Sequence, residues 1–229
     1  MKFLLDLLFP KFCIGCKTIG RYICHSCFQS YVFQKTQRCH VCDTISVDGK
    51  THQSCRIVSS IDGVYSLLEY KGIAKVFIKN IKYQRMFSVL DDFFSLLSID
   101  IKQNIIHILN SYNIDYVQPI PLHSQRKRIR GFNQAEYIAH HISLLTHIPV
   151  VNILERKVNT SPQAYIHKKE LRVHNIKGAF CYKGNFLCKG KTILLIDDLF
   201  TTGSTAKEAA RELKINGVTR IFVFTLAHG

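Results

Sequence analysis

The sequence predicts an α/β protein in which a parallel sheet is flanked by helices and preceded by a small cysteine-rich module. Short aliphatic runs without polar alternation recur along the chain, as in strands that are covered on both faces. Segments with helical apolar spacing separate these runs. Seven of the nine cysteines lie within Cys13–Cys55, ahead of the first predicted strand. We therefore expect two units, residues 1–58 and residues 59–229.

The composition favours a folded chain with a polyanionic partner. Of the 229 residues, 47% are hydrophobic and 21% are charged, which supplies a core and argues against disorder. Lysine and arginine outnumber aspartate and glutamate by 31 to 16, so the formal net charge is +15. Nucleic acid, a diphosphate-bearing metabolite or an anionic membrane surface fits this charge. A basic surface without a special partner is the alternative.

The first nine residues, MKFLLDLLF, have some features of a signal peptide. Their apolar stretch is short, contains Asp6 and lacks a small-residue cleavage site before Pro10. We expect an amphipathic turn or helix that packs on the body of the protein. No other run approaches the roughly 18 apolar residues of a membrane span. The expected location is therefore the cytoplasm, without a membrane span.

Three C-x-x-C pairs and one H-x-x-C pair make up most of the cysteine-rich module. Two such pairs on a short loop can arrange four ligands tetrahedrally around zinc. A disulfide framework is the alternative, but it is typical of secreted domains. His40, inside the third pair, is an alternative ligand at the second site. The sequence predicts one or two structural zinc ions, the first held by Cys13, Cys16, Cys24 and Cys27 and the second by Cys39, Cys42, His52 and Cys55.

Strands and helices alternate after the cysteines, as in a sheet with right-handed crossovers. Ligands of such sheets bind at the carboxyl ends of the strands. The predicted strands cover residues 61–70, 115–122 (leading into a loop), 150–154, 192–196 and 218–225. The predicted helices cover residues 73–97 with a break near Arg85, a further stretch to about residue 109, residues 132–145, and a segment from Gly203 that ends at Gly217.

The stretch ILLIDDLFTTGSTAKEAA, residues 193–210, joins a buried strand to a helix. Two acidic residues, Asp197 and Asp198, are placed where the strand emerges, and a hydroxyl-rich turn follows. The backbone N–H groups and dipole of a helix N-terminus favour an anion such as phosphate. The nearby GNFLCKGKT precedes a strand and has one residue too many between its glycines, so it is no Walker loop.

Residues 193–205 resemble the 5-phosphoribosyl 1-diphosphate (PRPP) signature of type I phosphoribosyltransferases. The resemblance implies that the acids hold the ribose hydroxyls and that the turn holds the 5′-phosphate, with Mg²⁺ bridging diphosphate and ribose oxygens. The implied catalytic pair is Asp197 and Asp198, and the implied phosphate loop is Thr201, Thr202, Gly203, Ser204 and Thr205.

The whole chain resembles the ComF family, in which a cysteine-rich zinc ribbon precedes a phosphoribosyltransferase domain. Besides the cysteines, the resemblance rests on PIPL before a basic run and RGFNQ, and on Arg156 before Thr160 and Gln163. For Lys127, within the basic run, we expect an ordinary solvated position. The resemblance implies a diphosphate loop of Leu122, His123, Arg126, Arg128 and Arg130, and a flexible loop that includes Thr160, Gln163 and Arg172.

ComF resemblance also implies natural competence, in which the protein handles incoming single-stranded DNA with a competence helicase and other DNA-uptake proteins. Basic and aromatic residues occur together at Tyr31–Arg38 and at Lys82–Arg85, as single-strand binding requires. The sequence identifies no acceptor for ribosyl transfer. Three hypotheses follow in order: a DNA-uptake protein with a PRPP pocket, a metabolic phosphoribosyltransferase, and a PRPP-sensing regulator.

Overall fold

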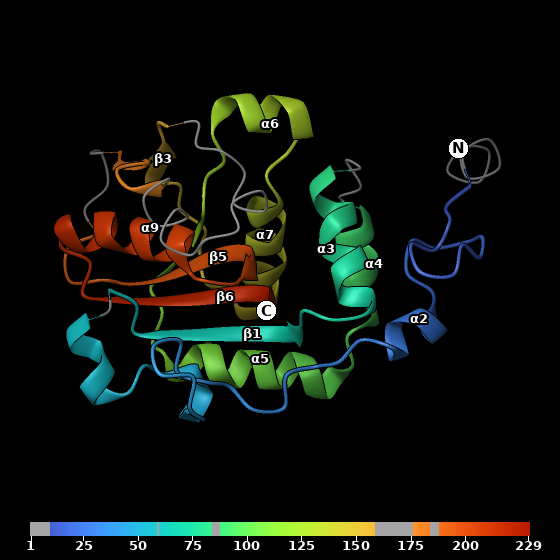
Figure 1. The fold of residues 1–229 in the computed structure, drawn as a ribbon, viewed down its shortest axis with the longest axis horizontal. Coiled ribbons are helices and arrows are strands. Elements are labelled where there is room, and N and C mark those ends of the chain that lie inside the picture. Colours follow the sequence, from blue (N-terminus) through green and yellow to red (C-terminus); the bar gives the residue numbers. More distant parts are fainter. Residues whose placement is uncertain (1–9, 59, 84–87, 159–175, 184–187) are drawn as a thin grey trace.

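A computed structural model describes residues 10–58, 60–83, 88–158, 176–183 and 188–229 (Figure 1). The expectations for residues 1–9 and for Thr160, Gln163 and Arg172 fall outside these ranges. Within them, no helix is long and apolar enough to cross a membrane.

A four-stranded parallel sheet lies at the centre of the described chain, with strand order β1-β6-β5-β2 (Figure 1). Leu194 of β5 pairs with Val117 on one side and with Phe222 on the other. The strands are β1 (Gly63–Glu69), β2 (Tyr116–Pro119), β5 (Thr192–Phe200) and β6 (Arg220–His228).

Both faces of the sheet are covered, which explains the uninterrupted aliphatic runs. Leu194 and Ile196 face a core built with α3, α4, α5 and α7, whereas Ile193 and Leu195 face a core built with α9. In Figure 1, α9 and α5 lie on opposite sides of the strands. The helices are α3 (Ile73–Tyr83), α4 (Ser88–Leu96), α5 (Ile99–Ser111), α6 (Ser124–Arg130), α7 (Gln134–Thr146) and α9 (Ser204–Ile215).

The predicted fold class, a parallel sheet flanked by helices with an N-terminal cysteine module, is confirmed. The break predicted near Arg85 falls on residues 84–87, outside the described ranges; α3 ends at Tyr83 and α4 begins at Ser88. The side chain of Asn133 accepts a hydrogen bond from the N–H of Ala135, at 3.1 Å, and so caps α7.

Three local expectations differ from the structure. β5 continues to Phe200, so Asp197 and Asp198 lie within the strand and not beyond it. The segment 150–154 is mostly not a strand: Val150 makes a single parallel bridge to Val117, and β3 begins at residue 154. The loop expected after Leu122 contains the helix α6. The strands β3 (Leu154–Arg156) and β4 (Phe180–Tyr182) form a separate antiparallel pair.

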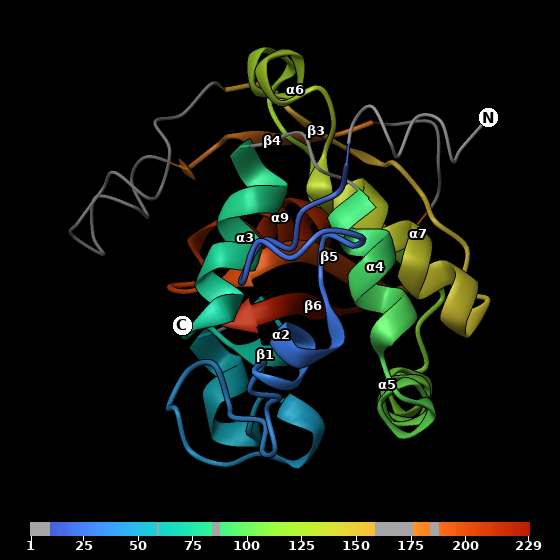
Figure 2. The ribbon, with the colours of Figure 1, turned by 90° about the vertical axis from the view of Figure 1, so that its right-hand side faces the viewer.

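The cysteine-rich segment packs against the sheet and its helices. Phe33 bridges to Leu68, and Lys50 bridges to Gly63, at the two ends of β1. Ile23 and Tyr31 belong to the same buried core as α3 and α4. In Figure 2, α2 lies in front of the sheet, and its Phe28 packs on Phe93 of α4, with ring centroids 5.8 Å apart. This segment contains α2 (His25–Gln29) and two 3-10 helices, η1 (Val47–Gly49) and η2 (Gln53–Val58). The domain boundary at residue 58 stays a prediction.

Candidate metal centres and anion-binding cleft

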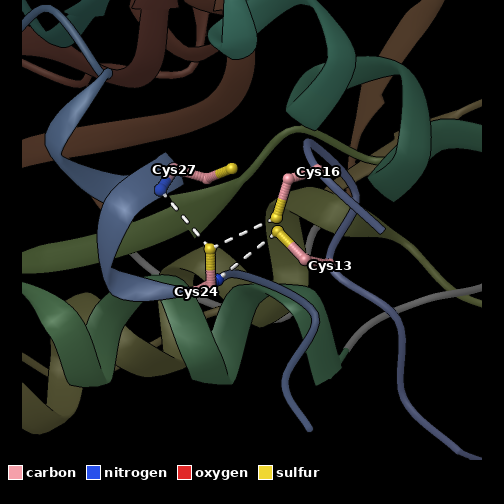
Figure 3. A group of neighbouring side chains, drawn as sticks. All are labelled: Cys13, Cys16, Cys24 and Cys27. Carbon is pink, nitrogen blue, oxygen red and sulfur yellow. Dashed lines mark hydrogen bonds between the residues drawn. The ribbon is translucent and has the colours of Figure 1, made fainter. Parts of the chain in front are cut away.

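Four cysteine sulfurs converge between the turn at residues 13–19 and the start of α2 (Figure 3). Their Sγ atoms all lie within 4.8 Å of one another, and those of Cys16 and Cys24 are 3.6 Å apart. The backbone N–H groups of Cys24 and Cys27 donate to the sulfurs of Cys13 and Cys24, at 3.5 and 3.4 Å. Such N–H donors stabilise thiolates, which are the form that binds zinc.

A second group brings Cys39, Cys42, His52 and Cys55 together, again with ligand atoms within 4.8 Å of one another. Nδ1 of His52 lies 3.3 Å from Sγ of Cys42, while Nε2 lies 3.2 Å from the carbonyl oxygen of Ile45. A hydrogen bond from Nε2–H to this carbonyl leaves Nδ1 as the ligand atom. His40 lies outside the group, and its Nε2 is 3.4 Å from the carbonyl oxygen of Ile61.

The two knuckles repeat one local structure, CIGCKTI at residues 13–19 and CHVCDTI at residues 39–45. The hydroxyl of Thr18 lies 3.0 Å from the sulfur of Cys16, and that of Thr44 lies 3.2 Å from the sulfur of Cys42. These hydroxyls are the main cause that lowers the pKa of both thiols to about 6. The repeat C-x-x-C-x-T-I is a sequence signal for two equivalent knuckles that cysteine spacing alone overlooks.

The donor sets fit zinc. Thiolates and imidazole in groups of four are typical ligands of structural zinc. All nine cysteines lie in the described part of the chain, and none forms a disulfide there, contrary to the alternative framework.

A cleft of about 550 Å³ opens at the carboxyl ends of β2 and β5. Its walls come from the end of β5 with the start of α9, from α6 with the start of α7, and from α3. Six basic residues and two acidic residues line it, so the cleft is strongly positive. The basic residues are Lys75, Lys79, Lys82, Arg126, Arg130 and Arg156.

The turn between β5 and α9 forms part of one wall of the cleft. All five residues of the predicted phosphate loop, Thr201–Thr205, line the cleft. Gly203 has φ +69° and caps α9, and the hydroxyls of Thr202 and Ser204 lie 2.5 Å apart. The ring of Phe200 packs beneath the turn, where a Cβ on Gly203 would lie 2.4 Å from its Cζ. This close packing requires glycine.

The two aspartates line the cleft side by side and face a lysine from α3. Nζ of Lys82 lies 2.9 Å from Oδ1 of Asp198, and the N–H of Asp198 donates to Asp197 at 2.9 Å. Burial, followed by the charge of Asp198, raises the pKa of Asp197 to about 7, against the opposing charges of Lys82 and Arg156. Burial disfavours the charged form of Lys82, but the Asp198 carboxylate outweighs it and raises the pKa of that lysine.

The predicted diphosphate loop divides into residues inside and outside the cleft. Leu122, Arg126 and Arg130 line it. His123 instead caps α6, accepting at Nδ1 from the N–H of Gln125 at 3.3 Å. Arg128 is exposed and is not among the lining residues. Among the neighbouring positions, Lys127 forms an exposed ion pair with Glu136 at 2.9 Å, as expected of a solvated position.

Several lining residues had no assigned place in the predicted site. Arg156, at the end of β3, is 6% exposed, and its guanidinium lies 5.6 Å from the ring centroid of Phe180. Burial lowers the pKa of Arg156 to about 10. Lys75, Lys79 and Lys82 share one face of α3, because they are four and three residues apart. That spacing could have been read from the sequence.

Tyr31, one of the aromatic residues considered for single-strand binding, is 5% exposed and packs on Phe77.

Comparisons with known proteins agree with these features. A family model described as "Double zinc ribbon domain" matches residues 4–56. Competence protein F of Haemophilus influenzae is 36% identical over 113 residues, 48% of each chain. Competence protein ComFC of Bacillus subtilis is 37% identical over 109 residues, 47% of this chain and 42% of the relative. The chain is thus similar to these competence proteins over about half of its length.

A further relative, DNA utilization protein YhgH of Escherichia coli K12, is 26% identical over 147 residues, 63% of this chain and 64% of the relative. The alignments thus span between about two fifths and just under two thirds of the length of these relatives.

The chain is also similar to solved structures, among them a phosphoribosyltransferase and a PRPP amidotransferase. Adenine phosphoribosyltransferase from Trypanosoma brucei has a TM-score of 0.38 and 12% identity, covering 72% of this chain and 83% of that chain. Glutamine PRPP amidotransferase from B. subtilis has a TM-score of 0.35 and 18% identity, covering 54% of this chain and 25% of that chain.

Proposed function

We propose that this protein binds PRPP with Mg²⁺ in the cleft and acts in the cytoplasm during natural competence, where it handles incoming single-stranded DNA. One observation carries the proposal. Two adjacent carboxylates, a hydroxyl-rich turn at a helix N-terminus and a group of arginines line the same cleft.

These three groups match the three parts of PRPP. The carboxylates of Asp197 and Asp198 accept hydrogen bonds from ribose hydroxyls. The residues Thr201–Thr205 and the first N–H groups of α9 donate to the 5′-phosphate. Arg126, Arg130 and Arg156 face the position left for the diphosphate, where guanidinium groups pair with phosphate oxygens.

The oxygen ligands of the cleft also suit Mg²⁺, which prefers carboxylates and phosphate oxygens. When bound with PRPP, the ion supplies positive charge between the diphosphate and the ribose. The chain's own contribution is to hold the sugar and both charged ends in a fixed orientation. The zinc sites have thiolate and imidazole donors, so they are structural and separate from this chemistry.

The DNA part of the proposal is supported by charge and by the relatives. Two of the relatives are named as competence proteins and a third as a DNA utilization protein. A formal net charge of +15 suits a polyanion, and six cations line one cleft. A competence helicase and other DNA-uptake proteins are the partners that this function requires.

Calorimetry with PRPP and Mg²⁺ tests the pocket. The double variant Asp197→Asn with Asp198→Asn removes both charges but keeps side chains of similar size, so we expect at least a tenfold loss of PRPP affinity, about 1.4 kcal/mol. The matched control is Asp91→Asn with Asp92→Asn, a second acidic pair on α4 outside the cleft. Equal affinities for the wild type and the cleft variant would refute the pocket assignment.

Two further measurements separate the hypotheses. Binding of an oligothymidylate should weaken steeply with salt, because lysine and arginine contacts release counterions from the strand. An affinity that is independent of salt would exclude DNA handling. Release of diphosphate from PRPP on addition of bases, amines or ammonia would instead identify a metabolic transferase.

A further inference from the structure

The positive charges of the cleft form separate groups. Arg156 is buried, and besides its burial the charges of Arg126 and Arg130 lower its pKa, so these three guanidinium groups lie close enough to interact. They face the position proposed for the diphosphate. The start of α9 faces the position proposed for the 5′-phosphate. Both anionic ends of PRPP are therefore matched without any lysine of α3.

The lysines of α3 form a different wall. Lys82 is paired with Asp198 at 2.9 Å. Lys75 and Lys79 are exposed and line the cleft, and no carboxylate in the described ranges forms an ion pair with either of them. Two positive charges thus remain beside the PRPP position. They are one helical turn apart, about 6 Å along the axis.

An aromatic ring accompanies these two lysines. Tyr70 follows β1, lines the cleft and is partly exposed. Its N–H donates to the carbonyl of His228 at 2.8 Å, which fixes its backbone against the end of β6. Nζ of Lys75 lies 5.8 Å from the centre of its ring. Single-stranded DNA is bound by such combinations of basic groups with aromatic faces.

We propose that Tyr70, Lys75 and Lys79, here called the α3 wall, bind single-stranded DNA beside the PRPP position. Lys75 and Lys79 contact successive phosphates, and the ring of Tyr70 stacks on a base. This inference rests on the proposed function and gives the strand a path along the open side of the cleft. The basic and aromatic positions of the cysteine module are not needed for this contact.

The test measures binding of a labelled oligothymidylate as a function of salt, with PRPP calorimetry on the same samples. The variant Lys75→Gln with Lys79→Gln should lower the salt slope by about 1.4, because each contact to a single strand contributes about 0.7. At 0.1 M salt, a slope lower by about 1.4 corresponds to an affinity for the oligothymidylate about 25-fold weaker than that of the wild type. PRPP affinity should change by less than about twofold, well under 1.4 kcal/mol.

A matched control removes the same charge elsewhere. Lys189→Gln with Arg220→Gln alters two exposed cations at the amino ends of β5 and β6, away from the cleft. This control should leave the slope unchanged. Tyr70→Leu should weaken strand binding by about fivefold or more without changing the slope, because it removes stacking and no charge. Tyr70→Phe keeps the ring and should bind as the wild type does.

The outcomes distinguish this inference from the proposed function. If the wild type binds the strand and the α3 wall variant keeps the same affinity and slope, the inference is wrong and the proposed function stands. If PRPP affinity falls as much as strand affinity, the α3 wall belongs to the PRPP site and the inference is wrong. If the wild type shows no salt-dependent strand binding, both the inference and the DNA part of the proposed function are refuted.

Discussion

Replacing Gly203 by alanine perturbs the turn that connects β5 to α9. The residue has φ +69°, and an added Cβ would lie 2.4 Å from Cζ of Phe200 and 2.9 and 3.0 Å from its two Cε atoms. The Phe200 side chain is 3% exposed. Its ring makes edge contacts with the rings of His40 and His228, whose centroids are 6.0 and 5.4 Å away. The ring therefore has little room to move.

Two costs add at this position. A left-handed conformation costs a residue with a Cβ about 1–2 kcal/mol. Overpacking against a buried ring costs about 1–3 kcal/mol more. We therefore expect Gly203→Ala to lower the free energy of unfolding by about 2–5 kcal/mol. Gly178→Ala is a matched control, because Gly178 also has φ +69° but has no atom within 4 Å of an added Cβ. The control should lose only about 1–2 kcal/mol.

Urea denaturation of the zinc-loaded protein gives both free energies, and calorimetry gives the PRPP affinities. Gly203→Ala should also weaken PRPP binding, because relief of the contact with Phe200 displaces the N–H groups at the start of α9. Gly178→Ala should bind PRPP as the wild type does. Equal destabilisation by the two substitutions would refute the packing argument. Unchanged PRPP affinity in Gly203→Ala would refute the assignment of this turn to the phosphate.

Two other predictions concern the metal centres and pH. Metal analysis should give two zinc ions per chain, and Cys39→Ser with Cys42→Ser should leave one; unchanged zinc content in this variant would contradict the second site. Because the pKa of Asp197 is raised from 3.8 to about 7 in the folded chain, its protonation stabilises the fold at low pH, and this contribution is lost as the pH rises through about 7. Asp197→Asn should therefore gain stability relative to the wild type above pH 7, as measured by urea denaturation at several pH values. PRPP binding should strengthen as Asp197 ionises, and Lys82→Met should move the midpoint of that profile to higher pH; an unchanged midpoint would contradict the electrostatic coupling.

The parts of the fold that sequence could predict are those fixed by local pattern. The aliphatic run before Asp197 predicted a strand covered on both faces, and successive residues of this run do enter two different cores. The cysteine spacing predicted the two ligand groups, because each C-x-x-C turn sets its own geometry. The strand, the turn and the helix around Gly203 followed from the same kind of local signal.

The parts that depend on tertiary context were missed. The helix α6 has no apolar periodicity, and its ends are set by the His123 cap and by Gly131 at φ +81°. β3 and β4 are three residues each and are far apart in the sequence, so their pairing leaves no local pattern. Packing of α3 and β3 around the cleft brings Lys82 and Arg156 to the aspartates, and neither residue belongs to the strand-turn-helix motif.

A crystal structure with PRPP and Mg²⁺ tests the central claim most directly. The account predicts the ribose hydroxyls within hydrogen-bond distance of Asp197 and Asp198, and the 5′-phosphate against the N–H groups of residues 201–205. Density for the sugar phosphate elsewhere on the protein, with this cleft free of it at saturating PRPP, would contradict the account.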